Sequence, residues 1–370
     1  MAARASAADQ EFMDVALSLA ARNLGDTWPN PAVGCVLVKD GHVIGRGWTE
    51  SGGRPHAETQ ALMRAQSPVH GATAYVTLEP CSHHGKTPPC ADALISAGVT
   101  RAVIATGDPD PRVNGRGAAR LREAGVEVIE GVGKAAADRQ NAGFFLKVAQ
   151  GRPLFALKIA TTLDGRIALA SGESRWITGE TARRAVHVLR SRFDAILVGS
   201  ETALTDDPLL TCRMDGYTGR PKVRIILDRR LRLAPSSELV KTAPQIPTWV
   251  MTATEATSTS RYGELVKSGV DVVPLKDASD HAGFAFAVGR ALAERGLTRV
   301  LIEGGGQVAA AFLRAGLIDE VAWFRGPSVI GGDGRASIHP MGLIDLADMP
   351  RFQPRESFNF GLDTLDILAR

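Results

Sequence analysis

The fold of this chain is decided by two short segments, His56-Ala57-Glu58 and Pro80-Cys81-Ser82-His83-His84-Gly85-Lys86-Thr87-Pro88-Pro89-Cys90. Together they supply one imidazole and two thiols, and a catalytic zinc ion prefers three protein ligands with a fourth position open to water. Gly52-Gly53-Arg54-Pro55 interrupts regular structure before the histidine, and residues 57–66 are typical of a helix. The pattern therefore predicts a catalytic metal site whose ligands are His56, Cys81 and Cys90.

Glu58 follows the histidine by two residues, on the first turn of the expected helix. This spacing is too short for an easy fourth ligand from the same side, but it allows contact with water at the metal. Zinc with two thiolates and a neutral imidazole has about no net charge, so it acidifies water less than an all-histidine site does. A neighbouring base must help, and Glu58 is the predicted catalytic proton carrier.

The two cysteines lie at the ends of expected elements. Residues 73–78 are rich in β-forming side chains and end at Glu79-Pro80, which places Cys81 at the carboxyl end of a strand. Cys90 follows Pro88-Pro89 and precedes an expected helix over residues 91–98 that closes with glycine. The start of a helix favours a thiolate, so the position suits a metal ligand.

Two alternatives to catalysis exist for these ligands, because cysteines and histidines also occur as buried apolar residues or in structural zinc knuckles. An acid two residues after the histidine and a proline before the first cysteine favour the deaminase signature His-x-Glu…Pro-Cys-x-x-Cys. The chain departs from that signature in one respect, since eight residues rather than two separate Cys81 from Cys90.

The long-spaced segment 80–90 closely resembles the motif of the bifunctional deaminase/reductase family of riboflavin biosynthesis, and the similarity continues through segments 30–36 and 108–111 and the whole second half. The resemblance implies a cytidine-deaminase-like domain that removes an exocyclic amino group from a diaminopyrimidinone carrying a ribosylamino 5′-phosphate. It implies four substrate contacts, at Asn30, His83, Lys86 and Asp108.

These four side chains also suit such roles physically. Lys86 and His83 can hold a phosphate, while Asn30 and Asp108 offer donors and acceptors to a sugar or ring. Each also has a simpler interpretation, since an Asn-Pro pair is commonly a turn and a lysine or a loop histidine is commonly solvated.

Composition bounds the architecture and the partners. At 370 residues two domains are expected, and 44% hydrophobic with 22% charged residues is typical of a globular chain. A net charge of +3 is too small to imply a nucleic-acid partner, and no apolar stretch or secretion signal implies a membrane. Four cysteines form no disulfide framework, so we expect a cytoplasmic protein. The expected partners are a small phosphorylated pyrimidine substrate and further copies of the same chain in a homo-oligomer.

The expected first domain, residues 1–149, is a three-layer α/β unit. Hydrophobic periodicity predicts a helix over residues 11–24, a hairpin around Asp40-Gly41 and a single long helix over residues 132–149. Strands alternate with helices between these, so the metal should lie at strand ends. The expected second domain, residues 150–370, begins with a linker at 150–153 and a strand at 154–160, and carries no further ligand cluster.

A second candidate site lies at Gly304-Gly305-Gly306, between an expected strand at 300–302 and a helix at 307–315. Backbone amides at such a turn and the start of a helix can bind a pyrophosphate. Three glycines are also common in ordinary tight turns, and the pattern is not Gly-x-Gly-x-x-Gly, so a Rossmann fold does not follow.

The surrounding segments 158–166, 172–177 and 205–211 resemble the reductase half of the same family, which has a dihydrofolate-reductase-like fold. The resemblance places NADPH near Ala160, Trp176, Thr202, Asp206, Gly304, Gly305 and Gly306. It places the phosphorylated ribose near Ser174, Arg190, Leu210, Arg213 and Glu303. Arg229 departs from the pattern, because a small hydroxyl residue is expected there.

These assignments also have physical support and simpler alternatives. Arginines form bidentate bonds to phosphate, and Glu303 can hold sugar hydroxyls or favour an iminium. Simple core packing is the alternative for Trp176, and a solvated helix face is the alternative for Arg190.

The sequence as a whole predicts zinc-dependent deamination of the pyrimidine followed by NADPH-dependent reduction of its ribosyl side chain to ribityl. One rival is a nucleoside or tRNA-base deaminase with an accessory nucleotide-binding domain, which the cysteine spacing opposes. Another is a non-enzymatic, zinc-stabilised protein whose second half senses a nucleotide.

Overall fold

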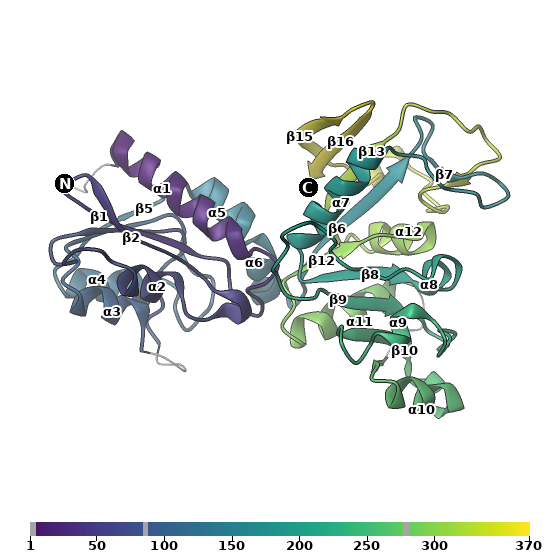
Figure 1. The fold of residues 1–370 in the computed structure, drawn as a ribbon, viewed down its shortest axis with the longest axis horizontal. Coiled ribbons are helices and arrows are strands. Elements are labelled where there is room, and N and C mark those ends of the chain that lie inside the picture. The colour runs from purple at the N-terminus through teal and green to yellow at the C-terminus, as the bar shows by residue number, and fades with distance from the viewer. Residues whose placement is uncertain (1–4, 84–87, 277–280) are drawn as a thin grey trace. The chain divides into compact units, whose positions relative to one another are not determined.

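The computed structural model describes residues 5–83, 88–276 and 281–370. The chain folds into two compact units, Met1–Gln150 and Gly151–Arg370, which are treated separately below (Figure 1).

The first unit is built on a five-stranded sheet of order β2-β1-β3-β4-β5. Its strands are β1 (Gly34–Lys39), β2 (His42–Trp48), β3 (Thr73–Val76), β4 (Arg101–Ile104) and β5 (Glu127–Glu130). β1 pairs antiparallel with β2 and β3, whereas β3, β4 and β5 are parallel. The predicted hairpin is confirmed, with Asp40 and Gly41 both at positive φ, as a two-residue turn between twisted strands requires.

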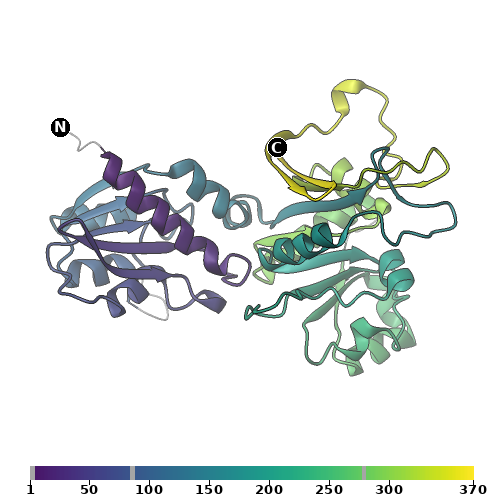
Figure 2. The same ribbon diagram turned by 45° about the horizontal axis from the view of Figure 1, so that its top comes forward.

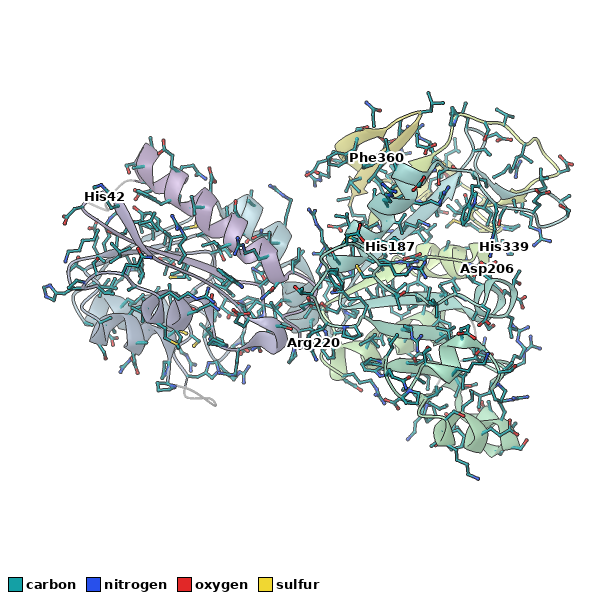
Figure 3. All side chains as sticks on the ribbon, in the orientation of Figure 1. His42, His187, Asp206, Arg220, His339 and Phe360 are labelled. Atoms are coloured by element: carbon teal, nitrogen blue, oxygen red, sulfur yellow. The ribbon has the colours of Figure 1, made fainter. Side chains whose placement is uncertain are left out.

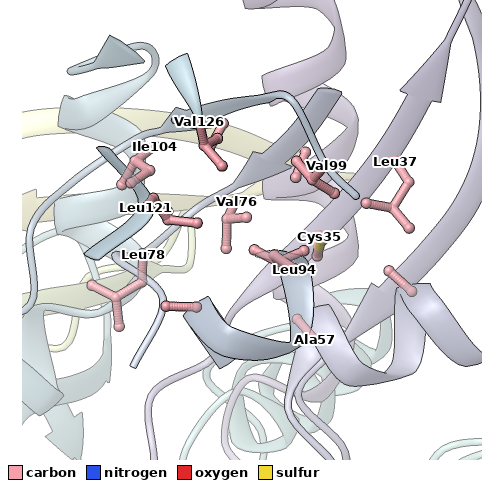
Figure 4. Close-up of a cluster of buried hydrophobic side chains, with 14 of the residues drawn as sticks. Cys35, Leu37, Ala57, Val76, Leu78, Leu94, Val99, Ile104, Leu121 and Val126 are labelled. Carbon is pink, nitrogen blue, oxygen red and sulfur yellow. The ribbon is translucent and has the colours of Figure 1, made fainter. Parts of the chain in front are cut away.

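Helices cover both faces of this sheet, which makes three layers. α1 (Ala7–Ala20) and α5 (Lys134–Gln140) share one core with the sheet, and α1 crosses that face in Figure 2. α2 (Ala57–Met63), α3 (Cys90–Ser96) and α4 (Arg116–Glu123) share the core on the other face, where Cys35, Val76 and Leu94 are fully or almost fully buried (Figure 4). Gly47 allows α2 to lie close to β2, because a Cβ there would approach the Ala57 carbonyl oxygen to 2.1 Å.

Several helix boundaries differ from the sequence prediction, and two of the differences have a clear physical cause. α1 begins four residues earlier, since Ser6 and Asp9 form a reciprocal capping box. The expected single helix over 132–149 is two helices, α5 and α6 (Ala142–Gln150). Asn141 separates them, because its side chain binds both the amide and the carbonyl of Ala32, at 2.9 and 3.0 Å.

The second unit contains a nine-stranded sheet of order β11-β10-β9-β8-β12-β6-β13-β16-β15. Neighbours from β11 to β13 are parallel, and β16 and β15 extend the sheet antiparallel. The strands are β6 (Leu154–Thr161), β8 (Ala195–Gly199), β9 (Val223–Leu227), β10 (Thr248–Ala253), β11 (Asp271–Leu275), β12 (Arg299–Ile302), β13 (Ile318–Arg325), β15 (Gln353–Phe360) and β16 (Asp363–Ala369). A small separate sheet pairs β7 (Arg166–Ala168) with β14 (Arg335–Ala336).

Six helices accompany these strands within the described residues of this unit. They are α7 (Glu180–Ser191), α8 (Ser200–Asp206), α9 (Glu238–Lys241), α10 (Ser260–Lys267), α11 (His281–Glu294) and α12 (Gly306–Arg314). Strands β6 and β12 and helix α12 lie where the sequence predicts them, but β15 and β16 were not predicted. β15 is exposed along nearly its whole length, so it lacks the alternating apolar pattern of a half-buried strand.

Among the described residues, no helix combines the length and apolar character needed to cross a bilayer.

Candidate active sites

The three predicted metal ligands lie together in the first unit. His56 is the residue before α2, Cys81 follows β3, and Cys90 is the first residue of α3. Their donor atoms all lie within 4.8 Å of one another. The Nδ1 atom of His56 is 3.3 Å from Cys90 Sγ and 3.8 Å from Cys81 Sγ. One nitrogen and two sulfurs at these separations can share a tetrahedral zinc ion, whose bonds are about 2.0–2.3 Å long, so the donor set fits zinc.

Hydrogen bonds fix the two cysteines in place. The backbone amide of Cys90 donates to Cys81 Sγ at 3.3 Å, and the amide of Ala91 donates to the Cys81 carbonyl at 3.2 Å. A hydrogen bond with the Cys90 thiol is the main cause that lowers the pKa of Cys81 to about 4, and bonds with His56 and with the Cys90 amide contribute less. The bond to Cys81 raises the pKa of His56. The site therefore favours a thiolate at Cys81, which is the form that binds a metal.

Glu58 is buried beside these ligands, with 4% of its surface exposed. Burial raises the pKa of its carboxyl group to about 7, and the Cys81 charge adds to the rise while His56 opposes it. A carboxyl group with a pKa near neutral pH can both accept and release a proton, which is what general acid and base catalysis requires.

The other predicted contacts of the first unit are distributed around this cluster. The side-chain amide of Asn30 donates to the Gly53 carbonyl at 2.8 Å, so it holds the loop that precedes His56. His83 has a buried Nδ1 atom with no hydrogen-bond partner among the described residues. Asp108 is buried and accepts a bond from the Asp110 amide at 2.8 Å; burial raises its pKa to about 6. Lys86 lies outside the described residues.

The second unit brings Arg190 and Glu303 together. Glu303 directly follows β12, and both of its oxygens accept bonds from the Arg190 guanidinium, at 2.6 and 2.9 Å. Arg190 also donates to the Thr211 carbonyl at 2.7 Å. Burial favours a higher pKa for Glu303, but the charge of Arg190 outweighs it and the net shift is downward. Arg190 is thus held in a charged pair, and the alternative of a solvated helix face is wrong.

Lys158 belongs to the same cluster, although it was not predicted as a site residue. It is partly buried on β6, where burial lowers its pKa while the charge of Glu303 opposes the change. The sequence contains a signal for it, because Lys158 is the one charged residue in the apolar run 154–160. A lysine that faces away from solvent in such a strand needs an acidic partner or a function.

The triple-glycine turn connects β12 to α12. Gly304 has a φ of 129°, and its carbonyl accepts a bond from the Gly199 amide at 2.9 Å. Thr202 lies beside the turn, with its hydroxyl 3.3 Å from where a Cβ on Gly305 would lie. Gly305 and Gly306 line a cavity of about 840 Å³ that also includes Asp228, Arg229 and His339. The turn therefore opens onto a space large enough for part of a nucleotide.

The remaining predicted residues of the second unit occupy varied positions. Trp176 is 67% exposed and lies against the Arg183 guanidinium at 4.2 Å, so the alternative of core packing is wrong.

The other predicted contacts lie on several elements of this unit. Ser174 is exposed, and Asp206 is the last residue of α8. Leu210 is buried with a positive φ of 49°. The Arg213 amide donates to His187 Nδ1 on α7 at 3.2 Å (Figure 3), and Ala160 packs against the core beneath that helix.

Asp228 and Arg232 were also not predicted as site residues. Asp228 directly follows β9, is 1% exposed, and has one buried oxygen without a hydrogen-bond partner among the described residues. Arg232 donates to the Ser200 hydroxyl at 2.6 Å beside it. Arg229, where a small hydroxyl was expected, lies over the Phe284 ring at 5.3 Å.

Fold and sites together define a two-part enzyme, a zinc-binding deaminase domain followed by a reductase domain of dihydrofolate-reductase-like fold. Residues 6–106 match the family model for the cytidine and deoxycytidylate deaminase zinc-binding region, and residues 153–365 match the RibD C-terminal domain. These matches indicate zinc and a nucleotide as cofactors.

The chain belongs to the family of the riboflavin biosynthesis protein RibD, the bifunctional deaminase/reductase of that pathway. RibD of Escherichia coli (strain K12) is 41% identical, covering 96% of this chain and 97% of its own length. RibD of Aquifex aeolicus is 40% identical, covering 98% of each. A solved structure of Acinetobacter baumannii RibD (form 1) superposes with a TM-score of 0.87 at 38% identity and 98% coverage of both chains. The predicted family, fold class and pair of activities are thereby confirmed.

Proposed function

We propose that the two units catalyse successive steps on one phosphorylated pyrimidine, with residues 1–149 as the deaminase domain and 150–370 as the NADPH-dependent reductase domain. The first step is hydrolytic deamination of 2,5-diamino-6-ribosylamino-pyrimidinone 5′-phosphate, and the second reduces the ribosyl side chain to ribityl. A solved structure of a diaminohydroxyphosphoribosylaminopyrimidine deaminase/5-amino-6-(5-phosphoribosylamino)uracil reductase from Thermotoga maritima is 37% identical to this chain, with a TM-score of 0.85. This similarity supports the substrates proposed for this chain.

The observation that carries the proposal for the first unit is the buried Glu58 beside three converging metal ligands. Zinc held by His56, Cys81 and Cys90 supplies a Lewis acid that acidifies water. Glu58 takes the proton when the water oxygen bonds to the ring carbon, and it delivers a proton to the amino nitrogen as the carbon–nitrogen bond breaks. Ammonia leaves and the ring gains a carbonyl. A carboxyl pKa near 7 suits both transfers.

Substrate binding in this unit is assigned to Asn30, His83, Lys86 and Asp108. The Nδ1 atom of His83 is buried and has no hydrogen-bond partner within residues 5–83, 88–276 and 281–370, which supports the assignment, because a buried polar atom needs a partner that a ligand can supply. Asp108 is buried and its pKa is raised to about 6, which suits a carboxyl group that bonds to a sugar or ring.

In the second unit, the proposed binding groups for the sugar phosphate are Ser174, Arg190, Leu210, Arg213 and Glu303. NADPH supplies a hydride when bound, and its proposed contacts are Ala160, Trp176, Thr202, Asp206, Gly304, Gly305 and Gly306. The opened ribosylamino sugar offers a protonated carbon–nitrogen double bond as the acceptor. Glu303 stabilises the positive nitrogen, while Lys158 can donate to a sugar oxygen. Support comes from the ion pair that fixes Glu303 in one orientation.

We further propose that the enzyme is a cytoplasmic homo-oligomer. All four cysteines are free thiols in the structure, which fits a reducing compartment.

Both proposed activities are tested with a single purified sample. Zinc content, ammonia release and NADPH oxidation are measured on the diaminopyrimidinone phosphate. We expect ammonia without NADPH, and NADPH oxidation only after deamination. Oxidation of NADPH before any ammonia appears would contradict the order, and ammonia released instead from cytidine or a tRNA would contradict the substrate.

A further inference from the structure

A buried carboxylate outside the groups assigned so far connects the metal ligand Cys81 to Asp108. Glu79 lies two residues before Cys81 and is 4% exposed. Its oxygens accept four backbone N–H groups. One oxygen accepts from Gly117 at 2.8 Å and Ala118 at 3.1 Å, and the other accepts from Gly115 at 2.9 Å and Asp108 at 3.3 Å.

Two of these bonds make Glu79 the N-terminal cap of α4. The residue before that helix, Gly115, has a left-handed conformation and no side chain to cap with. Gly117 and Ala118 are in the first turn, where amides lack intrahelical partners and a negative charge is favourable. A side chain from a different segment therefore supplies the cap, so α4 is held relative to the segment that carries Cys81.

The close approach of α4 to that segment leaves little freedom. A Cβ on Gly117 would lie 2.0 Å from the carbonyl oxygen of Pro80, the residue between Glu79 and Cys81. The backbone of Pro80 cannot move far enough to relieve such a clash, so only glycine fits at position 117. The Glu79 amide in turn donates to the Thr106 carbonyl at 2.9 Å, which attaches the end of β4.

The longest of the four bonds comes from the backbone amide of Asp108, the residue whose carboxylate is proposed to bind substrate. The Asp108 amide donates to Glu79, and the Asp108 carboxylate accepts from the Asp110 amide at 2.8 Å. The backbone of Asp108 is therefore anchored on Glu79, and its side chain is oriented by its own turn.

We propose that Glu79 is a positioning residue for deamination: its three bonds from the start of α4 hold its carboxylate in place, and its bond from the Asp108 amide fixes Asp108 relative to the metal ligand Cys81. This inference rests on the proposed role of Asp108 in substrate binding. Glu79 itself contacts neither the metal donors nor the substrate in this account. A group that acts only through Asp108 should change substrate binding more than the chemical step.

The test is a double-mutant cycle of Glu79→Gln and Asp108→Asn in the full-length zinc enzyme. The glutamine side chain has the same shape as glutamate, but an NH₂ group replaces one of the two acceptor oxygens. The two backbone N–H groups that bond to that oxygen therefore lose their acceptor. We expect Glu79→Gln to raise the deaminase KM about 10-fold or more, with kcat changed less and zinc content kept. When Asp108 is already replaced by Asn, Glu79→Gln should raise the deaminase KM by less than about a further twofold. NADPH oxidation on the deaminated intermediate should stay at the wild-type rate.

Asp194→Asn is the matched control. Asp194 is a buried carboxylate in the second unit that also accepts backbone bonds, from Thr298 at 2.6 Å and Arg299 at 2.9 Å. Its substitution should leave the deaminase KM unchanged. Should Glu79→Gln fail to fold, Glu79→Asp keeps both acceptors on a shorter side chain and enters the same cycle, with a smaller rise in KM.

Two results would overturn the inference. One is a multiplicative effect of the two substitutions on KM, which would mean that Glu79 does not act through Asp108. The other is a loss of zinc and of kcat at unchanged KM, which would mean that Glu79 serves the metal ligand alone. A wild-type enzyme that releases no ammonia from the pyrimidine would instead refute the proposed function.

Discussion

The metal site and the reductase site differ in how the chain assembles them. The ligands His56, Cys81 and Cys90 lie close together in the sequence. They precede α2, follow β3 and begin α3, respectively. Lys158, Arg190 and Glu303 come from strands and a helix spread along the whole second unit. A metal needs a few donors in close contact, whereas a sugar phosphate and a cofactor need many weaker contacts over a larger surface. A single substitution should therefore be more damaging in the first site than in the second.

The largest effect is expected for Cys81→Ser, which removes a thiolate ligand. Zinc content should fall, and ammonia release should drop by more than about 10³-fold, or about 4 kcal/mol of activation free energy. NADPH oxidation on the deaminated intermediate should persist. Cys35→Ala, which removes a buried thiol outside the ligand set, should keep its zinc. Loss of both activities in Cys81→Ser would show that the two units are not independent.

Next in size is Glu58→Gln, which keeps the shape of the side chain but removes its proton transfer. Zinc should remain bound while kcat for ammonia release falls by about 10²–10⁴-fold. Metal analysis and a continuous ammonia assay give both values. The exposed Glu11→Gln is the matched control. Deamination at nearly the wild-type rate would refute the assigned role.

A smaller loss is expected in the reductase site for Arg190→Lys. Lysine keeps the charge but cannot form the two bonds to Glu303, so kcat/KM for reduction should fall by about 10–100-fold. Deamination should be unaffected. Arg184→Lys, on the exposed face of the same helix, should leave both rates unchanged. Equal losses in the two variants would indicate a general effect on α7.

The smallest effect concerns stability and its dependence on pH. The Arg101 guanidinium lowers the pKa of the buried Asp9 carboxyl, whose oxygens lie 2.7 and 3.0 Å from it. The ionised form is thus favoured in the folded state, so its stabilisation is complete above the unfolded pKa of about 3.9 and is lost as pH falls below it. Asp9→Asn should cost about 3 kcal/mol at pH 7 in urea unfolding, and the difference should shrink toward pH 3.

A surface pair gives the reference for that measurement. Glu130→Gln removes an ion pair with Arg122 in which both side chains are about half exposed, and should cost less than about 1 kcal/mol. A pH-independent cost of Asp9→Asn would contradict the charge argument.

The same contrast explains what the sequence could predict. The metal ligands and Glu58 were predictable because few residue types bind zinc and their spacing is local. The parallel strands were predictable from apolar runs. Asn141 was not recognised as a helix break, since its partner Ala32 is distant in sequence. Glu79 looked like the end of a strand, because its four partners are backbone amides that no side-chain pattern reveals.

The reductase contacts depended mainly on family resemblance. Lys158 was missed even though it interrupts an apolar strand, because a single lysine carries little information without its acidic partner from β12. Asp228 and Arg232 were missed for a similar reason, since only the fold brings the end of β9 to the cavity.

The bonds from Asn141 to Ala32 also set a limit on how the first unit can be produced alone. Any chain that stops before residue 141 leaves a buried amide and a buried carbonyl at the start of β1 without partners, at a cost of about 1–3 kcal/mol for each group. A chain that stops before residue 140 also loses the bond from Gln140 to the Leu17 carbonyl near the end of α1. During synthesis, these bonds to the first helix and to the segment before the first strand therefore form only after α5 and Asn141 have left the ribosome.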